Sequence, residues 1–446
     1  MKFQRIKGTV DILPPETEKW QYLEQVVRRV MARFNYREIR VPIFEQTELF
    51  ARGIGEATDI VNKEMYSFTD MGDRPITLRP EATASVVRAY IEESLGKQQP
   101  LQKLYYLGPM FRQEKPQKGR QRQFQQFGAE AIGSSSPLVD AEMILLSLEI
   151  LTALGLGDFV VSINSVGTPE SRARHRAELL KFVKPLAMKF PEVDRDKIDR
   201  NPLRLFDSKL DVTRNLMQDA PLLIDYLEDD CKRDFEIVQQ ALTDLGIKYE
   251  VDPRLVRGLD YYTRTAYEVK SESLGAQDAL CGGGRYDLLI EELGGEPTPA
   301  VGFAAGIERI LLALEEQGVA LPQQNELDLF VVAREPAERE HAFKLVQRLR
   351  RHGLAAELDY LERSQKAQMK EAARQQASFG LFVFADTLSE QRYQLKNLAD
   401  GEQEELGFDE IVAKVQQRKR RTQLQAFTQE EREWLAAVDR QKKTDS

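Results

Sequence analysis

The stretch MFRQEKPQKGRQRQFQQFGAE, from Met110 to Glu130, has apolar, strand-like ends and a basic, polar middle. Between Arg112 and Arg122 it carries five basic residues against the single acid Glu114. Its ends are too apolar for a disordered basic tail. The surrounding sequence, KLYYLGPMFRQE and RQFQQFGAEAIG, predicts two strands joined by about eight polar residues, which is the pattern of a long-looped hairpin.

The predicted hairpin has one strongly polar face, because alternate residues of a strand point to the same side. That face carries Arg112, Glu114, Arg122, Phe124, Gln126 and Glu130, whereas Gln125, Phe127 and Ala129 point the other way. Burying such polar groups without partners costs several kcal/mol each, so this is not an ordinary core face. It is either a solvated sheet face or the floor of a polar pocket. In such a pocket Phe124 could stack on a base and the arginines could bind phosphates in a forked geometry.

Composition narrows the class of protein. The 446 residues suffice for two or three domains, and the net charge of -9 places any nucleic-acid binding in local basic patches. The only cysteines, Cys231 and Cys281, exclude a disulfide framework and a cysteine-rich zinc site. The only histidines are His175, His341 and His352, which argues against a histidine-based triad or metal site in the N-terminal part. Without an 18-residue apolar run or a signal-peptide core, a cytoplasmic protein is the default expectation.

Several segments outline the organisation of the chain. PETEKWQYLEQVVRRVMARFN has helical spacing of apolar residues, and YREIRVPIFEQ predicts a strand interrupted by Pro42, which favours a sheet edge or an interface. Residues from about 168 to 249 are mostly helical and charged, as expected of an insertion. The stretch YEVDPRLVRGLDYYTRTAYEVKS is strand-like again, and residues 320–326 read as a linker. Beyond it, strands and helices alternate, which predicts a small α/β domain with a mixed sheet.

Three further stretches present polar or aromatic side chains beside predicted turns and helix starts. LVRGLDYYT sets Arg257 beside two tyrosines, VGFAAGIERI sets Arg309 in the first turn of a helix, and LRPEAT presents Glu81 and Thr83 before another helix. Taken singly, each has an ordinary explanation: half-buried aromatic rings, a solvated arginine, or a charge at a helix start. Only the ordered set points to a functional site.

Taken together, these stretches resemble the three signature motifs of class II aminoacyl-tRNA synthetases. VPIFEQTELF around Pro42 looks like the first motif, MFRQE…RQFQQFGAE like the second and VGFAAGIER like the third. LVRGLDYYT and CGGGRYD are similar to the two histidine-specific motifs of the histidyl-tRNA synthetase family. The resemblance extends to about residue 415 and includes LKNLADGEQEEL.

The resemblance implies an α+β fold. The class II catalytic domain, built on an antiparallel sheet, would span residues 1–320 with a helical insertion at about 168–249. An α/β anticodon-binding domain would span 326–415, followed by a helical, partly basic tail at 416–446. The implied activity is histidine–tRNA ligation by a homodimer without a membrane partner. Its substrates would be L-histidine, ATP and histidine tRNA, with Mg²⁺ held mainly through the ATP phosphates and no dedicated metal site.

The resemblance also implies roles for individual residues. Arg112 and Arg257 would be the catalytic cations, approaching the α-phosphate of ATP from opposite sides. ATP would be bound by Arg112, Glu114, Arg120, Phe124 and Arg309, with Phe124 on adenine and Glu114 near its amino group. Histidine would be bound by Glu81, Ala82, Thr83, Arg112, Gln126, Glu130, Arg257, Tyr261, Tyr262 and Tyr286. Within that set, Glu130 and Tyr262 would take the two imidazole nitrogens, and Gln117 and Arg122 would approach the first base pair of the tRNA.

Some points depart from the family pattern or remain open. Many relatives have other residues at Lys115, Gln121 and Gln125, which leaves details of the tRNA contact open. In a regular strand, Tyr261 and not Tyr262 would share a face with Arg257, unless a bulge intervenes at Gly258. The alternatives are a catalytically inactive paralogue acting as a regulatory subunit or RNA-binding sensor, and a class II synthetase for another amino acid. The intact arginines and LVRGLDYYT argue against both.

Overall fold

The computed structural model describes residues 3–55, 58, 60–271, 274, 279–322, 327–385 and 391–421. The chain forms two compact units, Met1–Leu321 and Pro322–Ser446, each of which is described by itself. Most of the expected linker, at 323–326, and most of the expected tail, at 422–446, lie outside the described residues.

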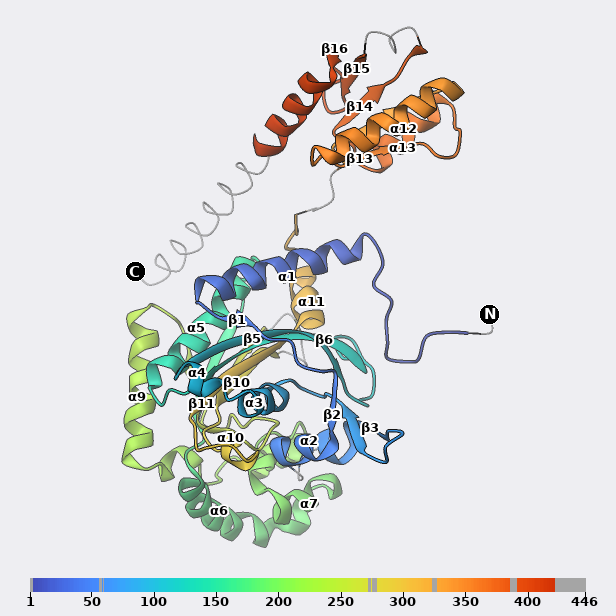
Figure 1. Ribbon diagram of the computed structural model, residues 1–446. Helices are drawn as coiled ribbons and strands as arrows, with labels where there is room; N and C mark the ends of the chain where they lie inside the picture. Colours follow the sequence, from blue (N-terminus) through green and yellow to red (C-terminus); the bar gives the residue numbers. More distant parts are fainter. Residues whose placement is uncertain are drawn as a thin grey trace. The chain divides into compact units, whose positions relative to one another are not determined.

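An eight-stranded sheet forms the centre of the first unit (Figure 1). In spatial order its strands are β1 (Arg37–Glu38), β5 (Gln102–Phe111), β6 (Gln123–Ile132), β11 (Ala300–Gly306), β10 (Ala279–Arg285), β9 (Thr263–Lys270), β7 (Val160–Ser165) and β8 (Glu250–Val251). The six inner strands pair antiparallel, and only the short edge strands β1 and β8 pair parallel to their neighbours. The predicted antiparallel sheet is confirmed.

The hairpin predicted from the opening stretch is present as β5 and β6. Its register runs without interruption from Gln102 opposite Ile132 to Phe111 opposite Gln123. Because no bulge shifts the pairing, alternate β6 residues keep to one face, as predicted. Phe127 and Ala129 therefore pack into the core on the opposite side from the polar row.

Helices cover both faces of this sheet (Figure 1). On one face α1 (Glu16–Arg33), α5 (Pro137–Ala153), α9 (Asp229–Asp244) and α11 (Ile307–Glu316) share the largest apolar cluster with the strands. On the other face α3 (Thr83–Glu92) and α10 (Leu289–Glu292) pack over a second cluster, next to α2 (Thr47–Ile54) and α4 (Leu95–Gln98). The helix expected from the spacing of Leu23, Val26 and Val30 is α1, in which all three are buried.

The strand interrupted by Pro42 divides between two sheets. Its first part is β1 at the edge of the large sheet, which confirms the expected edge position. Its second part, β2 (Phe44–Gln46), pairs with β4 (Pro75–Leu78), which also pairs with β3 (Tyr66–Thr69). The π-helical residues Ile60–Glu64 precede β3.

Residues 168–249 contain mainly helices. They comprise α6 (Pro169–Val183), α7 (Glu192–Arg200), α8 (Asp211–Leu216), α9 and the 3₁₀ helices η2 (Lys184–Lys189), η3 (Pro202–Leu205) and η4 (Leu223–Tyr226). This segment has a small apolar core of its own, which includes Leu179, Phe190 and Ile198. Its last helix, α9, instead packs Phe235 and Val238 into the core under the large sheet.

The second unit is an α/β domain with a mixed sheet, as predicted. Its strand order is β13 (Ala356–Leu358), β12 (Leu329–Val332), β14 (Phe379–Phe382), β15 (Arg392–Asn397) and β16 (Gln403–Gly407). The strand β12 is parallel to both of its neighbours, whereas β15 and β16 are antiparallel. The helices are α12 (Pro336–Arg351), α13 (Gln365–Arg374) and helical residues 408–421. In the described part of the chain, no helix has the length and apolarity needed to cross a membrane.

Candidate active site

A cavity of about 230 Å³ lies over the polar face of the β5–β6 hairpin. Its walls come from β6, β9, β10 and β11, from the start of α11 and from the loops that precede α3 and β9. Of the residues expected from the sequence, it is lined by Glu81, Thr83, Arg112, Glu114, Arg120, Phe124, Gln126, Glu130, Arg257, Tyr261, Tyr262, Tyr286 and Arg309. The polar face is therefore a pocket floor and not a solvated surface.

Glu130 is the buried carboxyl group at one end of the cavity. Its Oε1 accepts a hydrogen bond of 2.8 Å from the Thr83 hydroxyl, and its Oε2 accepts one of 2.5 Å from the Tyr286 hydroxyl. Burial raises the pKa of the Glu130 carboxyl to about 8. Gly302 faces it across β6 and β11, and a Cβ there would lie 1.7 Å from Oε2. The neighbouring strand thus makes room for this carboxylate by carrying glycine.

Three tyrosine rings surround this end of the cavity. The ring centroids of Tyr261 and Tyr262 are 4.7 Å apart, and those of Tyr261 and Tyr286 are 5.6 Å apart. All three side chains are buried. They form an aromatic enclosure with a carboxylate and hydroxyl groups inside it, which suits a flat, polar ring.

Glu81 occupies the N-terminal end of α3. Its carboxylate accepts the backbone N–H groups of Thr83 at 2.6 Å and Ala84 at 3.0 Å, while burial raises the pKa of the carboxyl. Ala82 is fully buried in the adjoining apolar cluster and does not line the cavity. The buried Oε1 of Gln126 has no hydrogen-bond partner within the described residues. This region therefore holds polar atoms that a ligand amino group could satisfy.

The other end of the cavity is lined by arginines. Arg112 donates from Nε to the Pro80 carbonyl at 2.9 Å, and its guanidinium lies 5.3 Å from the centre of the Phe124 ring. Arg120 donates to Glu114 at 2.9 Å. Arg309, from the first turn of α11, donates to the Ala279 carbonyl at 3.1 Å. Burial and then the nearby Arg120 lower the pKa of Arg309, as expected where cations converge on a site for an anion.

Arg257 enters the cavity from outside any strand, which corrects the strand prediction for this stretch. Only β8 and β9 are extended, and residues 252–262 form turns and irregular backbone. The alternation rule therefore does not apply, and both Tyr261 and Tyr262 line the cavity with Arg257 without a bulge at Gly258. The Arg257 guanidinium lies 5.8 Å from the centre of the Tyr262 ring.

Two glutamates of the cavity were missed by sequence reasoning. Glu268, in β9, accepts a hydrogen bond of 2.9 Å from Arg257 Nη1. Burial disfavours the charge of Arg257, but Glu268 and Tyr262 together outweigh that effect and raise the pKa of the guanidinium. Glu308 accepts the backbone N–H of Gln125 at 2.9 Å, and burial raises the pKa of its carboxyl to about 7. Glu268 could have been sought because a buried arginine such as Arg257 needs a carboxylate partner. Glu308 could have been sought because it directly precedes Arg309 in the sequence.

Comparison with known proteins decides the family. A family model described as histidyl-tRNA synthetase matches residues 8–310, and one described as anticodon binding domain matches residues 325–418. A histidine–tRNA ligase of Halothermothrix orenii is 50% identical over 411 residues, which cover 92% of this chain and 98% of the relative. The chain belongs to the histidyl-tRNA synthetase family. The resemblance noted in the sequence is confirmed, and so is the C-terminal anticodon-binding domain.

Other relatives of the enzyme agree with this assignment. A histidine–tRNA ligase of Synechocystis is 49% identical and covers 94% of this chain and 93% of its own length. The crystal structure of apo S. aureus histidyl-tRNA synthetase superimposes with a TM-score of 0.79 at 41% identity, over 93% of this chain and 99% of the other. The enzyme class is histidine–tRNA ligase, and the alternative of an inactive paralogue is not favoured.

The residues expected to meet the tRNA lie outside the main cavity. Gln117 lines a separate hollow that is bordered by residues 3–11 of the N-terminal segment. The Arg122 side chain donates to the Glu114 carbonyl at 3.4 Å, and its backbone N–H donates to the Gly8 carbonyl at 2.7 Å. The basic loop thus lies between the cavity and the N-terminal segment of the synthetase.

Proposed function

We propose that the enzyme joins L-histidine to ATP in this cavity, releasing pyrophosphate, and then transfers histidine from the adenylate to the 3′ end of histidine tRNA. The observation that carries the proposal is the pairing, in one cavity, of a buried carboxylate inside a tyrosine enclosure with a cluster of arginines. The first feature suits an imidazole ring, and the second suits a triphosphate.

In the adenylation step, a carboxylate oxygen of histidine attacks the α-phosphorus of ATP and the bond to pyrophosphate breaks. Two anions must meet, and negative charge builds on the phosphoryl oxygens, so fixed cations supply the largest catalytic effect. Arg112 and Arg257 are the residues proposed for this role. The buried Nε of Arg257 has no hydrogen-bond partner in the described part of the chain, which leaves it able to take a ligand oxygen.

The remaining arginines and Phe124 are proposed to hold the rest of ATP. Arg120 and Arg309 would bind the outer phosphates, and Phe124 would stack on adenine with Glu114 near its amino group. Mg²⁺ would accompany the nucleotide. Two acids of the cavity, Glu114 and Glu268, are already paired with arginines, which favours the phosphates as the main ligands of the ion.

Histidine selection is assigned to the opposite end. Glu130 and Tyr262 would take the two imidazole nitrogens, because an imidazole donates at one nitrogen and accepts at the other. Tyr261 and Tyr286 would enclose the ring. Glu81, Thr83 and Gln126, with the buried Ala82 between the first two, would form the subsite for the α-amino group.

Transfer to tRNA needs no general base from the protein. The attacking carboxylate of the first step is already ionised, and in the second step a phosphate oxygen of the adenylate could accept the proton of the tRNA hydroxyl. Gln117 and Arg122 are proposed to contact the acceptor end. The second unit is proposed to bind the anticodon region. We also propose that the enzyme acts in the cytoplasm, where protein synthesis occurs.

We also propose that the enzyme is a homodimer. The cross-strand pairs of the small sheet place Phe44, Phe68, Ile76 and Leu78 on one face, since Phe44 opposes Leu78 and Phe68 opposes Ile76. Phe44 is 51% exposed and Phe68 is 50% exposed. A contiguous apolar face of this kind favours burial against a second copy of the chain. Sedimentation of the purified enzyme tests this proposal, and a monomer at micromolar concentration would contradict it.

The proposed activity is tested by pyrophosphate exchange with each proteinogenic amino acid in turn, followed by charging of a histidine tRNA transcript. Exchange should depend on histidine, and the transcript should become charged with it. Exchange that depends on another amino acid, or on none, would refute the assignment of the cavity to histidine.

A further inference from the structure

The irregular segment from Gly258 to Arg264 carries two of the three tyrosines that enclose the proposed histidine pocket. Its first residues form turns, and only its last two belong to β9. Backbone hydrogen bonds hold the two ends of this segment, from the Asp260 N–H to the Ile54 carbonyl at 3.2 Å and from the Arg264 N–H to the Gly167 carbonyl at 2.9 Å. Side chains of the helical segment 168–249 hold both ends as well.

At the first end, an arginine of this helical segment forms hydrogen bonds with the backbone and with a side chain. Arg204, in the 3₁₀ helix η3, donates from Nη2 to the Gly258 carbonyl at 2.8 Å and to Asp260 Oδ1 at 2.9 Å. Asn201 donates to the same oxygen at 3.3 Å, and Arg172 of α6 donates to the Asp260 carbonyl at 3.4 Å. Ion pairing and backbone bonding together fix the peptide groups that follow Gly258 and Asp260, just before the tyrosines.

Apolar contact reinforces this first end. Leu203, the neighbour of Arg204, packs against the same apolar cluster that contains Tyr261, Tyr262 and Tyr286. The helical segment thus supplies part of the wall behind the tyrosine rings, although among the described residues it contributes none to the cavity lining.

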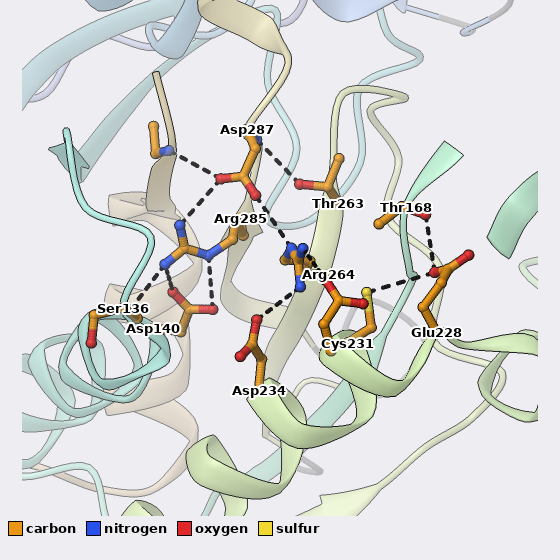
Figure 2. A network of polar contacts seen from close by, with 12 residues as sticks. Ser136, Asp140, Thr168, Glu228, Cys231, Asp234, Thr263, Arg264, Arg285 and Asp287 are labelled. Atoms are coloured by element: carbon orange, nitrogen blue, oxygen red, sulfur yellow. Dashed lines mark hydrogen bonds and ion pairs between the residues drawn. The ribbon is translucent and has the colours of Figure 1, made fainter. Parts of the chain in front are cut away.

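At the second end, the charges are reversed. Arg264 has a φ of +48°, a left-handed backbone conformation that is strained for a residue with a side chain. Asp230 and Asp234, in the first turns of α9, accept hydrogen bonds from its guanidinium at 2.7 and 2.8 Å. Figure 2 shows the bond between Arg264 and Asp234. These two carboxylates hold the arginine in place, and strain of this kind persists only where the surroundings enforce it.

The strained residue has a consequence for the pocket. The pairing of β9 with β10 shifts register there, because Gly284 opposes Ala266 whereas Arg285 opposes Thr263. Such a bulge changes the direction in which neighbouring side chains point. It lies directly between Tyr262 and the strand that leads into Tyr286. Figure 2 shows Arg285 and Asp287 packed beside Arg264, with Asp140 and Asp234 around them.

We propose that Arg204, Asp230 and Asp234 of the helical segment are positioning residues for the histidine pocket. They hold Gly258–Arg264 from both ends and thereby set Tyr261 and Tyr262 against the substrate ring. The affinity for histidine then depends on side chains that never touch it. This inference rests on the proposed function, which makes the cavity a site for histidine.

The proposed positioning residues should affect histidine binding and ATP binding differently. The residues proposed to bind the nucleotide, such as Arg112, Arg120 and Phe124, lie on the β5–β6 hairpin and its loop, and not on the held segment. Loosening that segment should therefore weaken histidine binding and leave ATP binding nearly unchanged. A merely structural role for Arg204 would lower the melting temperature and affect both substrates alike.

The test measures the KM for histidine and for ATP in pyrophosphate exchange, beside melting temperatures, for Arg204→Ala, Asp260→Ala and the double variant. Each single change should raise the KM for histidine by about tenfold and leave that for ATP within about twofold. The double variant should lose less than the sum of the two single losses, because both single changes remove the Arg204–Asp260 ion pair. Arg204→Lys, which keeps the charge, should recover part of the loss.

Arg195→Ala is the matched control, because Arg195 lies in the same helical segment and, among the described residues, donates to the carbonyls of Phe190 and Met188 and to no part of Gly258–Arg264. It should leave both KM values unchanged. Equal increases in both KM values for Arg204→Ala, or additive losses in the double variant, would overturn the inference. If Arg204→Ala does not fold, Asp234→Asn carries the same comparison at the other end. A wild-type enzyme without histidine-dependent exchange would instead overturn the proposed function.

Discussion

Replacement of Gly302 by alanine offers a sharp test of how the cavity is built. The added Cβ would lie 1.7 Å from Glu130 Oε2 and 2.7 Å from the Ala129 carbonyl oxygen, both impossible contacts. Glu130 has little freedom to turn away, since Thr83 and Tyr286 hold its two oxygens. Either the carboxylate or strand β11 must move by roughly 1 Å, a displacement that can cost about a hundredfold in rate.

Gly302→Ala should therefore lower kcat/KM for histidine in pyrophosphate exchange by about a hundredfold or more, and overpacking should cost about 1–3 kcal/mol of stability. Gly157→Ala is the matched control, because a Cβ at Gly157 meets no atom within 4 Å. Both variants should be compared at a temperature well below their unfolding transitions. If folded Gly302→Ala retains histidine-dependent exchange within about threefold of wild type, the close approach of Gly302 to Glu130 does not matter for the site.

Four further predictions concern the proposed roles. Arg257→Ala should slow histidine-dependent pyrophosphate exchange by about a hundred- to a thousandfold with an unchanged melting curve, and a loss below about threefold would exclude it as the catalytic cation. Glu130→Ala should raise the KM for histidine far more than that for ATP, and an equal effect on both would make Glu130 structural. Burial raises the pKa of Glu130 from 4.5 to about 8, so the folded state keeps a proton that the unfolded chain loses between these values. The contribution of this group to the free energy of unfolding therefore falls as pH rises through that window. The melting temperature of Glu130→Gln, relative to that of wild type, should rise from about pH 5 to about pH 8. A chain ending near Leu321 should retain pyrophosphate exchange but charge tRNA far more weakly, because a distant second contact adds affinity, and full charging would contradict this role for the second unit.

The sequence predicted the parts of the fold that depend on local pattern. Alternation from Gln123 to Ile132 identified β6 and its polar face, because strand parity holds wherever no bulge intervenes. The ordered motifs then indicated the family and the antiparallel sheet. Helical spacing in the same way identified α1 and its buried side.

Local pattern failed where long-range contacts decide the backbone. Residues 252–262 are rich in apolar and aromatic side chains and looked like a strand, but turns and ion pairs with a distant helical segment hold most of that stretch in an irregular conformation. Glu268 was missed for a related reason, since its partner Arg257 reaches it from that irregular stretch. Sequence spacing could not predict the left-handed backbone of Arg264 or its ion pairs with Asp230 and Asp234. These contacts join a strand to a helix about thirty residues away in the sequence.

We expect histidine to bind with its ring at Glu130 and its carboxylate between Arg112 and Arg257. The most direct test is a crystal structure of the enzyme with L-histidine and a non-hydrolysable ATP analogue. One imidazole nitrogen should lie within hydrogen-bond distance of a Glu130 oxygen, and the substrate carboxylate should lie between the two arginines beside the α-phosphate. Histidine bound with its ring away from Glu130, or outside the tyrosine enclosure, would contradict it.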